Sequence, residues 1–151
     1  MDDRRGINDI GTLAGPATGR PVTKDDLVWV LQEMIDRAHA HGIMVIGCAL
    51  TPYGGAGYAR ENGEAIRQAV NQWIRTSRAF DAVVDFEATT RDTTDPTRLR
   101  APSDPGDHLH PNNASDEATA NAVDLSLFSG KHGKAARSKP RQGTPAFRRG
   151  R

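Results

Sequence analysis

The fold class is decided by the stretch Met44-Val45-Ile46-Gly47-Cys48-Ala49-Leu50. An unbroken apolar run of this length, without polar alternation, is typical of a strand that is buried on both faces of a parallel sheet. A second run, Ala82-Val83-Val84-Asp85-Phe86, has the same character. The two runs predict adjacent, parallel strands in an α/β fold.

Helical patterns alternate with these runs, as the crossover connections of a parallel sheet require. Thr23 is a suitable N-cap for an amphipathic helix from about Lys24 to His41, which we expect to stop at Gly42. The apolar spacing predicts a second helix from Glu64 to about Ser77 and a last one from about Ser115 to Leu127.

The net charge of +1 hides two unlike segments. Residues 131–151 contain eight basic residues and no acidic one, and they are too poor in apolar residues to offset the entropy of ordering. We therefore expect a domain over residues 1–129 and a basic, disordered tail over residues 130–151. Contact of this tail with nucleic acid is an alternative, but the tail lacks interleaved aromatic residues, which favours a solvated tail.

Cys48 is the single cysteine, which excludes an intramolecular disulfide, and its apolar neighbours predict a small buried side chain. No apolar segment approaches the roughly twenty residues that span a bilayer, so no membrane partner is expected. Met1–Arg5 lacks the apolar core of a signal peptide, so the chain as written is expected to be cytoplasmic.

Candidate catalytic residues occur in two short motifs. Gly106-Asp107-His108-Leu109-His110-Pro111-Asn112 sets Asp107 three residues before His110 in a loop ahead of a helix. A histidine that deprotonates a hydroxyl needs a carboxylate on its other ring nitrogen, and Asp107 has the spacing to supply it. In Gly6-Ile7-Asn8-Asp9, Asn8 could donate to a developing oxyanion, or it could simply cap a turn. We expect Asp107 to contact His110, and Asn8 to face the same cleft.

These motifs resemble the third and last conserved blocks of the SGNH (GDSL-type) hydrolases, a family of esterases and acylhydrolases. The text between them is similar to the xylan-esterase-like branch, in the segments Leu50-Thr51-Pro52-Tyr53, Glu64-Ala65-Ile66-Arg67, Asn71-Gln72-Trp73-Ile74 and Asp85-Phe86. The resemblance covers roughly residues 6–128. It implies a flavodoxin-like (SGNH) three-layer sandwich, cleavage of a carboxylic ester or an acylated carbohydrate, and no cofactor. It also implies that His110 is the general base and acid, Asp107 its orienting partner and Asn8 an oxyanion donor.

The nucleophile that the family requires is not found in the chain. The serines are Ser77, Ser103, Ser115, Ser126, Ser129 and Ser138, and none stands in a Gly-Asp-Ser or Gly-x-Ser-x-Gly setting. We therefore expect a truncated SGNH hydrolase-like domain that begins after the nucleophile and lacks its first strands, with an unpaired edge at Met44–Leu50. The alternative to an ester hydrolase fragment is a non-catalytic remnant or a binding module.

Other candidate residues have structural alternatives. Tyr53 and Tyr58, in the glycine-rich loop 51–63, could line a sugar-binding cleft or pack against a helix. His108 beside His110 suggests a metal pair, but no third and fourth ligands follow at fixed spacing, so no metal site is expected.

Overall fold

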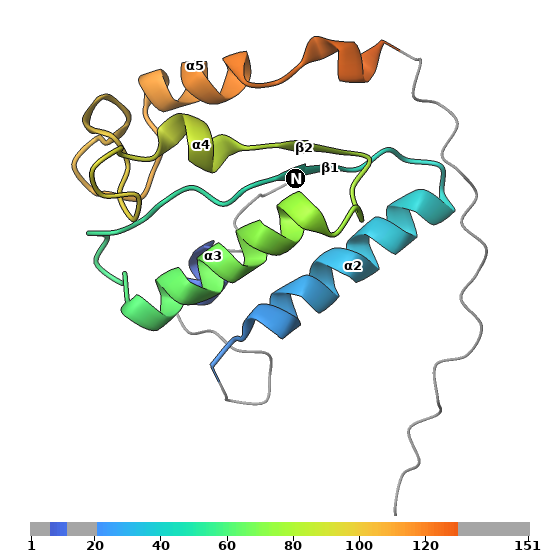
Figure 1. The fold of residues 1–151 in the computed structure, drawn as a ribbon, viewed down its shortest axis with the longest axis horizontal. Helices are drawn as coiled ribbons and strands as arrows, with labels where there is room; N and C mark the ends of the chain where they lie inside the picture. Colours follow the sequence, from blue (N-terminus) through green and yellow to red (C-terminus); the bar gives the residue numbers. More distant parts are fainter. Residues whose placement is uncertain (1–6, 12–20, 130–151) are drawn as a thin grey trace, which may run out of the picture.

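The computed structural model describes residues 7–11 and 21–129. Its elements, labelled in Figure 1, are α1 (Ile7–Gly11), α2 (Lys24–Ala40), β1 (Ile46–Cys48), α3 (Glu61–Thr76), β2 (Ala82–Val84), α4 (Phe86–Thr90), the 3-10 helix η1 (Ala101–Ser103), α5 (Asn113–Asn121) and the 3-10 helix η2 (Leu125–Phe128). The basic tail from residue 130 and the glycine at position 6 lie outside the described residues.

Strands β1 and β2 are adjacent and parallel, as the two apolar runs predict. Ile46 pairs with Ala82, and Cys48 pairs with Val84. In Figure 1, α2 and α3 lie on one side of this strand pair and α5 lies on the other. The expectation of an α/β fold is therefore confirmed for the described part of the chain, which combines helices with a small parallel sheet.

Both strands are shorter than the apolar runs that contain them. The side chain of Asp85 accepts a hydrogen bond from the backbone N–H of Ala88 at 3.1 Å, so β2 gives way to α4 directly after Val84. The ladder then ends with one more bond, from the N–H of Ala49 to the carbonyl oxygen of Val84 at 3.1 Å. Strand β1 is consequently limited by the length of its neighbour.

The prediction that the run Met44–Leu50 is buried on both faces is wrong. Gly47 and Ala49 are buried, whereas Cys48 is exposed and Met44 keeps 38% of its surface exposed. A central strand is buried because it has neighbours along both edges. Within the described ranges, the sheet pairs β1 with β2 and with no further strand, which leaves this run partly uncovered.

Helix α2 begins and ends close to the predicted residues. Thr23 and Asp26 form a capping box, in which each side chain accepts a hydrogen bond from the backbone N–H of the other residue. At the other end, Gly42 adopts φ +70°, a left-handed conformation that glycine tolerates and that stops the helix. His39 then holds the turn by a contact of 2.8 Å between its Nε2 and Oδ2 of Asp81.

Helix α3 begins at Glu61, three residues before the predicted start. Gly63 lies in its first turn and is required there, because a Cβ at this position would lie 2.2 Å from the hydroxyl oxygen of Tyr53. The buried face of α3 includes Val70 and Ile74, which pack in the core with Ile10 of α1. The glycine therefore serves close packing of the helix rather than a turn.

The last predicted helix, Ser115–Leu127, is divided in the structure. Helix α5 ends at Asn121, and the side chain of Asp124 accepts a hydrogen bond from the N–H of Ser126 at 2.8 Å, which starts the separate turn η2. Asn112 caps α5 by accepting from the N–H of Ser115 at 3.0 Å. No helix in the described ranges is both long and apolar enough to cross a membrane.

Candidate functional site

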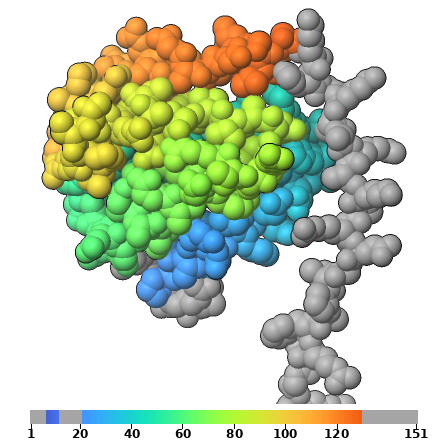
Figure 2. Space-filling view, in the orientation of Figure 1, coloured from blue at the N-terminus to red at the C-terminus, as the bar shows by residue number. Residues whose placement is uncertain are grey.

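Two loops meet where β1 and β2 end. The loop after β1 leads into α3, and the segment after α4 leads through η1 to α5. The two are joined by a hydrogen bond of 2.7 Å from the N–H of Gly54, in the loop after β1, to the carbonyl oxygen of Thr97, in the segment after α4. Figure 2 shows the segment between α4 and α5, in yellow, at one end of the molecule. Sites in open α/β sheets form at the carboxyl ends of the strands, and the candidate residues lie at this end.

Asp107 and His110 are in direct contact. Nδ1 of His110 lies 2.6 Å from Oδ2 of Asp107, and Oδ1 of Asp107 accepts the backbone N–H groups of Leu109 and His110 at 3.0 Å each. The hydrogen bond from His110, followed by these two N–H groups, lowers the pKa of Asp107 from 3.8 to about 2. Asp107 is therefore a carboxylate at neutral pH and can only accept, so Nδ1 of His110 carries the proton and Nε2 is left as the basic nitrogen.

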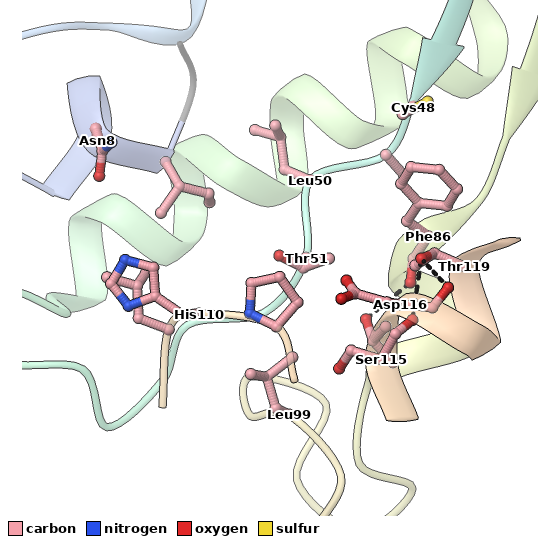
Figure 3. Close-up of a pocket in the computed structure, with 15 residues that line it drawn as sticks. Asn8, Cys48, Leu50, Thr51, Phe86, Leu99, His110, Ser115, Asp116 and Thr119 are labelled. Carbon is pink, nitrogen blue, oxygen red and sulfur yellow. Dashed lines mark hydrogen bonds between the residues drawn. The ribbon is translucent and has the colours of Figure 1, made fainter. Parts of the chain in front are cut away.

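His110 and Asn8 line the same pocket, which has a volume of about 700 Å³. Figure 3 shows these two residues at one end of the pocket, with Thr51 near the middle and Ser115, Asp116 and Thr119 at the other end. The side chain of His110 is 73% exposed, so a substrate can reach its ring without any movement of the protein. Two side chains that lie 102 residues apart in the sequence thus share one cavity.

The side chain of Asn8 is held by Tyr58, a residue of the glycine-rich loop. Asn8 lies in the short helix α1 rather than in the expected turn, and its Oδ1 accepts a hydrogen bond from the hydroxyl of Tyr58 at 2.9 Å. Burial, and secondarily the charge of Asp107, raises the pKa of Tyr58, so the phenol keeps its proton and donates. Its ring covers Gly11, where a Cβ would lie 2.0 Å from a ring carbon. Tyr58 therefore fixes the amide of Asn8.

Neither Tyr53 nor Tyr58, the two candidates for lining a cleft, is among the residues that line this pocket, and Tyr53 instead packs against a helix. It is 2% exposed and belongs to the hydrophobic core, where it contacts the first turn of α3 at Gly63. Its ring also stacks at an angle on that of Tyr58, with 6.1 Å between the ring centroids. The aromatic ring of Tyr53 packs in the core because burial of its large apolar area is favourable.

A second aspartate–histidine pair adjoins the first and was not predicted. Nδ1 of His108 lies 2.5 Å from Oδ2 of Asp104. The sequence signal was present in the four-residue spacing of these side chains, but the Asp107–His110 motif overlaps it. Among the described residues, no group of three or more histidine, cysteine, aspartate or glutamate side chains is arranged to hold a metal ion.

A buried polar cluster fixes the backbone where β1 leads into the pocket. The carbonyl oxygen of Leu50 accepts hydrogen bonds from Arg67 and Asn71 at 2.9 Å each, and the N–H of Leu50 donates to Oδ1 of Asn71 at 2.7 Å. Both side chains are fully buried, and Glu87 pairs with Arg67 at 2.9 Å. Sequence reasoning placed only apolar residues on this face of α3. The polar residues occupy it because Leu50 has no strand partner for its backbone groups in the described structure.

No nucleophile is positioned against His110 within the described residues. Ser115 lines the pocket, but it is 1% exposed and its hydroxyl donates to the carbonyl oxygen of Ser103 at 2.9 Å. No hydroxyl or thiol in the described ranges forms a hydrogen bond with the His110 ring. Cys48 reaches the pocket, as an exposed rather than a buried side chain.

Comparison with protein families places the chain. The model of the GDSL-like Lipase/Acylhydrolase family matches residues 6–118, about three quarters of the sequence. The chain therefore belongs to this family of hydrolases. A comparison with curated proteins finds no significant match.

Proposed function

We propose that this chain is the part of an ester hydrolase that supplies the general base and one oxyanion donor. The observation that carries the proposal is the 2.6 Å contact between Asp107 and His110, on a pocket that Asn8 also lines, in a member of the GDSL-like family. In this proposal Asp107 holds His110 in one tautomer and stabilises the imidazolium that forms during the reaction.

The reaction is acyl transfer through a serine. Nε2 of His110 takes the serine proton as the hydroxyl oxygen bonds to the ester carbonyl carbon, and the amide N–H of Asn8 donates to the oxygen that becomes negative. Collapse of the tetrahedral intermediate breaks the bond to the alcohol, which leaves with the proton from His110. Water then repeats the same steps on the acyl-serine and releases the acid.

The nucleophilic serine comes from protein sequence outside these 151 residues. None of the six serines stands in a nucleophile motif, and the one that lines the pocket, Ser115, is buried and donates to a backbone carbonyl. In this proposal, the protein sequence that supplies the serine also supplies the first strands of a flavodoxin-like (SGNH) sandwich. The exposed apolar side chains near β1, Met44 and Val83, support this view because a larger sheet and its covering layers would bury them.

The proposed substrate is a carboxylic ester, and an acylated carbohydrate is the more specific candidate. The pocket has apolar walls at Leu50, Phe86 and Leu109, which suit an acyl group, and polar groups at Thr51 and Asp116, which suit sugar hydroxyls.

The test is to express the chain together with the residues encoded directly upstream and to treat it with a fluorophosphonate probe of serine hydrolases. The expected result is stoichiometric labelling of a serine in a Gly-Asp-Ser segment, accompanied by turnover of acetylated xylo-oligosaccharides or p-nitrophenyl acetate. His110→Ala should slow labelling by a factor of about a thousand or more. His41→Ala, which changes an exposed histidine at the end of α2, is the matched control and should label at the parent rate.

Absence of a Gly-Asp-Ser segment upstream, in frame or one frame away, would overturn the proposal and leave a non-catalytic remnant or a binding module. Labelling that is indifferent to His110→Ala would overturn the role of His110 alone.

A further inference from the structure

The loop that leads to α5 contains two interleaved turns of the same design. In the first, Oδ1 of Asp104 accepts the backbone N–H groups of Gly106 and His108 at 2.8 and 3.1 Å, and Oδ2 contacts the His108 ring. In the second, Asp107 makes the corresponding three contacts with Leu109 and His110. The proposed base pair is therefore built on a turn whose first half is closed by another aspartate and histidine.

The backbone between the two turns is held in an unusual conformation. His108 has φ +61° and Gly106 has φ +105°, both in the left-handed region. Glycine adopts this region freely, but a residue with a Cβ does so only when other contacts hold it there. The hydrogen bonds that Asp104 accepts are contacts of that kind, since two of the three come from His108, one from its backbone N–H and one from its ring.

His108 is also seated against the loop that follows β1. A Cβ at Gly55 would lie 3.0 Å from Cδ2 of His108, so the imidazole packs directly over this glycine. Asp104 is the more buried partner, with a side-chain exposure of 16% against 37% for His108. Burial alone would raise the pKa of Asp104, but its hydrogen bonds with Gly106 and His108 outweigh burial and lower it, so Asp104 accepts as a carboxylate.

We propose that Asp104 and His108 are positioning residues, which hold the loop in the conformation that brings the Asp107 carboxylate against His110. Neither residue needs to touch the substrate for this role. The proposal rests on the proposed function only in giving His110 its catalytic purpose, because the positioning itself is a property of the loop.

The experiment reads the Asp107–His110 contact directly, without substrate. The carboxyl carbon of Asp107 is followed by ¹³C NMR in the 151-residue chain as the pH is lowered, for the parent, Asp104→Ala, Asp104→Asn, His108→Ala and His108→Gly. In the parent, the midpoint of the Asp107 titration should lie near pH 2, because the pKa of this carboxyl is lowered to about 2. Asp104→Ala and His108→Ala should each raise the proton affinity of Asp107 at least tenfold. The full difference between a pKa of about 2 and the ordinary 3.8 of aspartate corresponds to a factor of roughly 60.

The remaining variants separate backbone from side-chain effects. Asp104→Asn keeps an oxygen that accepts from the two N–H groups, and His108→Gly relieves the left-handed backbone, so each should shift Asp107 less than the corresponding alanine variant. The matched control is Asp92→Ala. Asp92 closes a similar turn in the same segment by accepting from the N–H groups of Thr94 and Asp95, but it contacts no histidine. Its loss should leave the titration of Asp107 unchanged.

An unchanged Asp107 midpoint in Asp104→Ala and His108→Ala would overturn the proposal, and so would an equal shift in Asp92→Ala. If Asp104→Ala lost the amide spectrum of the folded core, the shift of the Asp107 midpoint in His108→Ala would decide in its place. Because the measurement involves no ester, it can succeed where the esterase assignment fails, and it can fail where that assignment succeeds.

Discussion

The hydroxyl of Tyr58 lies 2.9 Å from Oδ1 of Asn8, and this contact joins two segments that are fifty residues apart in sequence. The oxygen and the NH₂ group of an asparagine amide can exchange places by a rotation of the amide through about 180°. A donor that is hydrogen-bonded to Oδ1 therefore fixes the side on which the NH₂ group lies. In this site the donor comes from the loop after β1, and the amide comes from α1. The orientation of the proposed oxyanion donor therefore depends on the packing of these two segments.

Tyr58→Phe should remove this hydrogen bond while the ring still covers Gly11. We expect the free energy of unfolding to fall by about 1 kcal/mol, the usual net value of such a bond, and the side-chain amide resonances of Asn8 to shift. Urea denaturation and ¹⁵N NMR measure the two effects.

Tyr53→Phe is the matched control for that change. The buried hydroxyl of Tyr53 has no hydrogen-bond partner among the described residues, so its removal should leave stability unchanged or increase it. A loss of stability equal to that of Tyr58→Phe would contradict the assignment of the bond to Asn8.

The contact between Asp107 and His110 should persist to unusually low pH. The pKa of Asp107 is lowered in the folded chain, from 3.8 to about 2, so the stability that this contact contributes is complete above pH 3.8 and is lost as the pH falls towards 2. The carboxyl resonance of Asp107 should report this midpoint. In His110→Ala the midpoint should return only part of the way to 3.8, because the N–H of Leu109 still donates to Asp107. A parent midpoint near 3.8 would show that the pair does not form in solution.

Removal of Glu87 should destabilise the whole domain. Its carboxylate is 1% exposed and accepts hydrogen bonds from Arg67 and Asn71, so Glu87→Ala leaves the buried guanidinium of Arg67 paired with Glu64 alone. Loss of one member of a buried pair costs about 3–5 kcal/mol when the other charge is left unpaired, so with Glu64 still in place we expect a loss of about 3 kcal/mol, which urea denaturation would detect as a large shift of the midpoint. Glu117→Ala, at an exposed position of α5, should change stability by less than about 0.5 kcal/mol. Equal effects of the two substitutions would show that the buried cluster does not hold β1 in place.

The sequence predicted those features that depend on local patterns. The capping box at Thr23 and the stop at Gly42 are each decided by a few neighbouring residues, and each of the two paired strands lies within a local apolar run. The contact between Asp107 and His110 belongs to the same class, because a three-residue spacing in a turn brings the side chains together.

Features that depend on distant parts of the chain were missed. The apolar run at β1 predicted full burial, but burial is decided by what covers a strand, and Cys48 remains exposed. Arg67 has a local partner in Glu64, but its burial depends on distant groups, which are the carbonyl oxygen of Leu50 and the carboxylate of Glu87 twenty residues away. The sequence left two alternatives open for Tyr53, a cleft or packing against a helix, because the glycine that admits its hydroxyl lies in the next helix.

The 151-residue chain alone should have no esterase activity that depends on its histidine. Removal of the nucleophile from a serine hydrolase costs on the order of a millionfold in turnover, and what remains comes from binding and from the oxyanion donors. We expect hydrolysis of p-nitrophenyl acetate at the rate of the His110→Ala variant, and no labelling by a fluorophosphonate probe. Stoichiometric labelling would contradict this expectation and show that one of the six serines completes the site. Ser115 would then be the first to replace by alanine, because among the described serines it is the one that lines the pocket with His110.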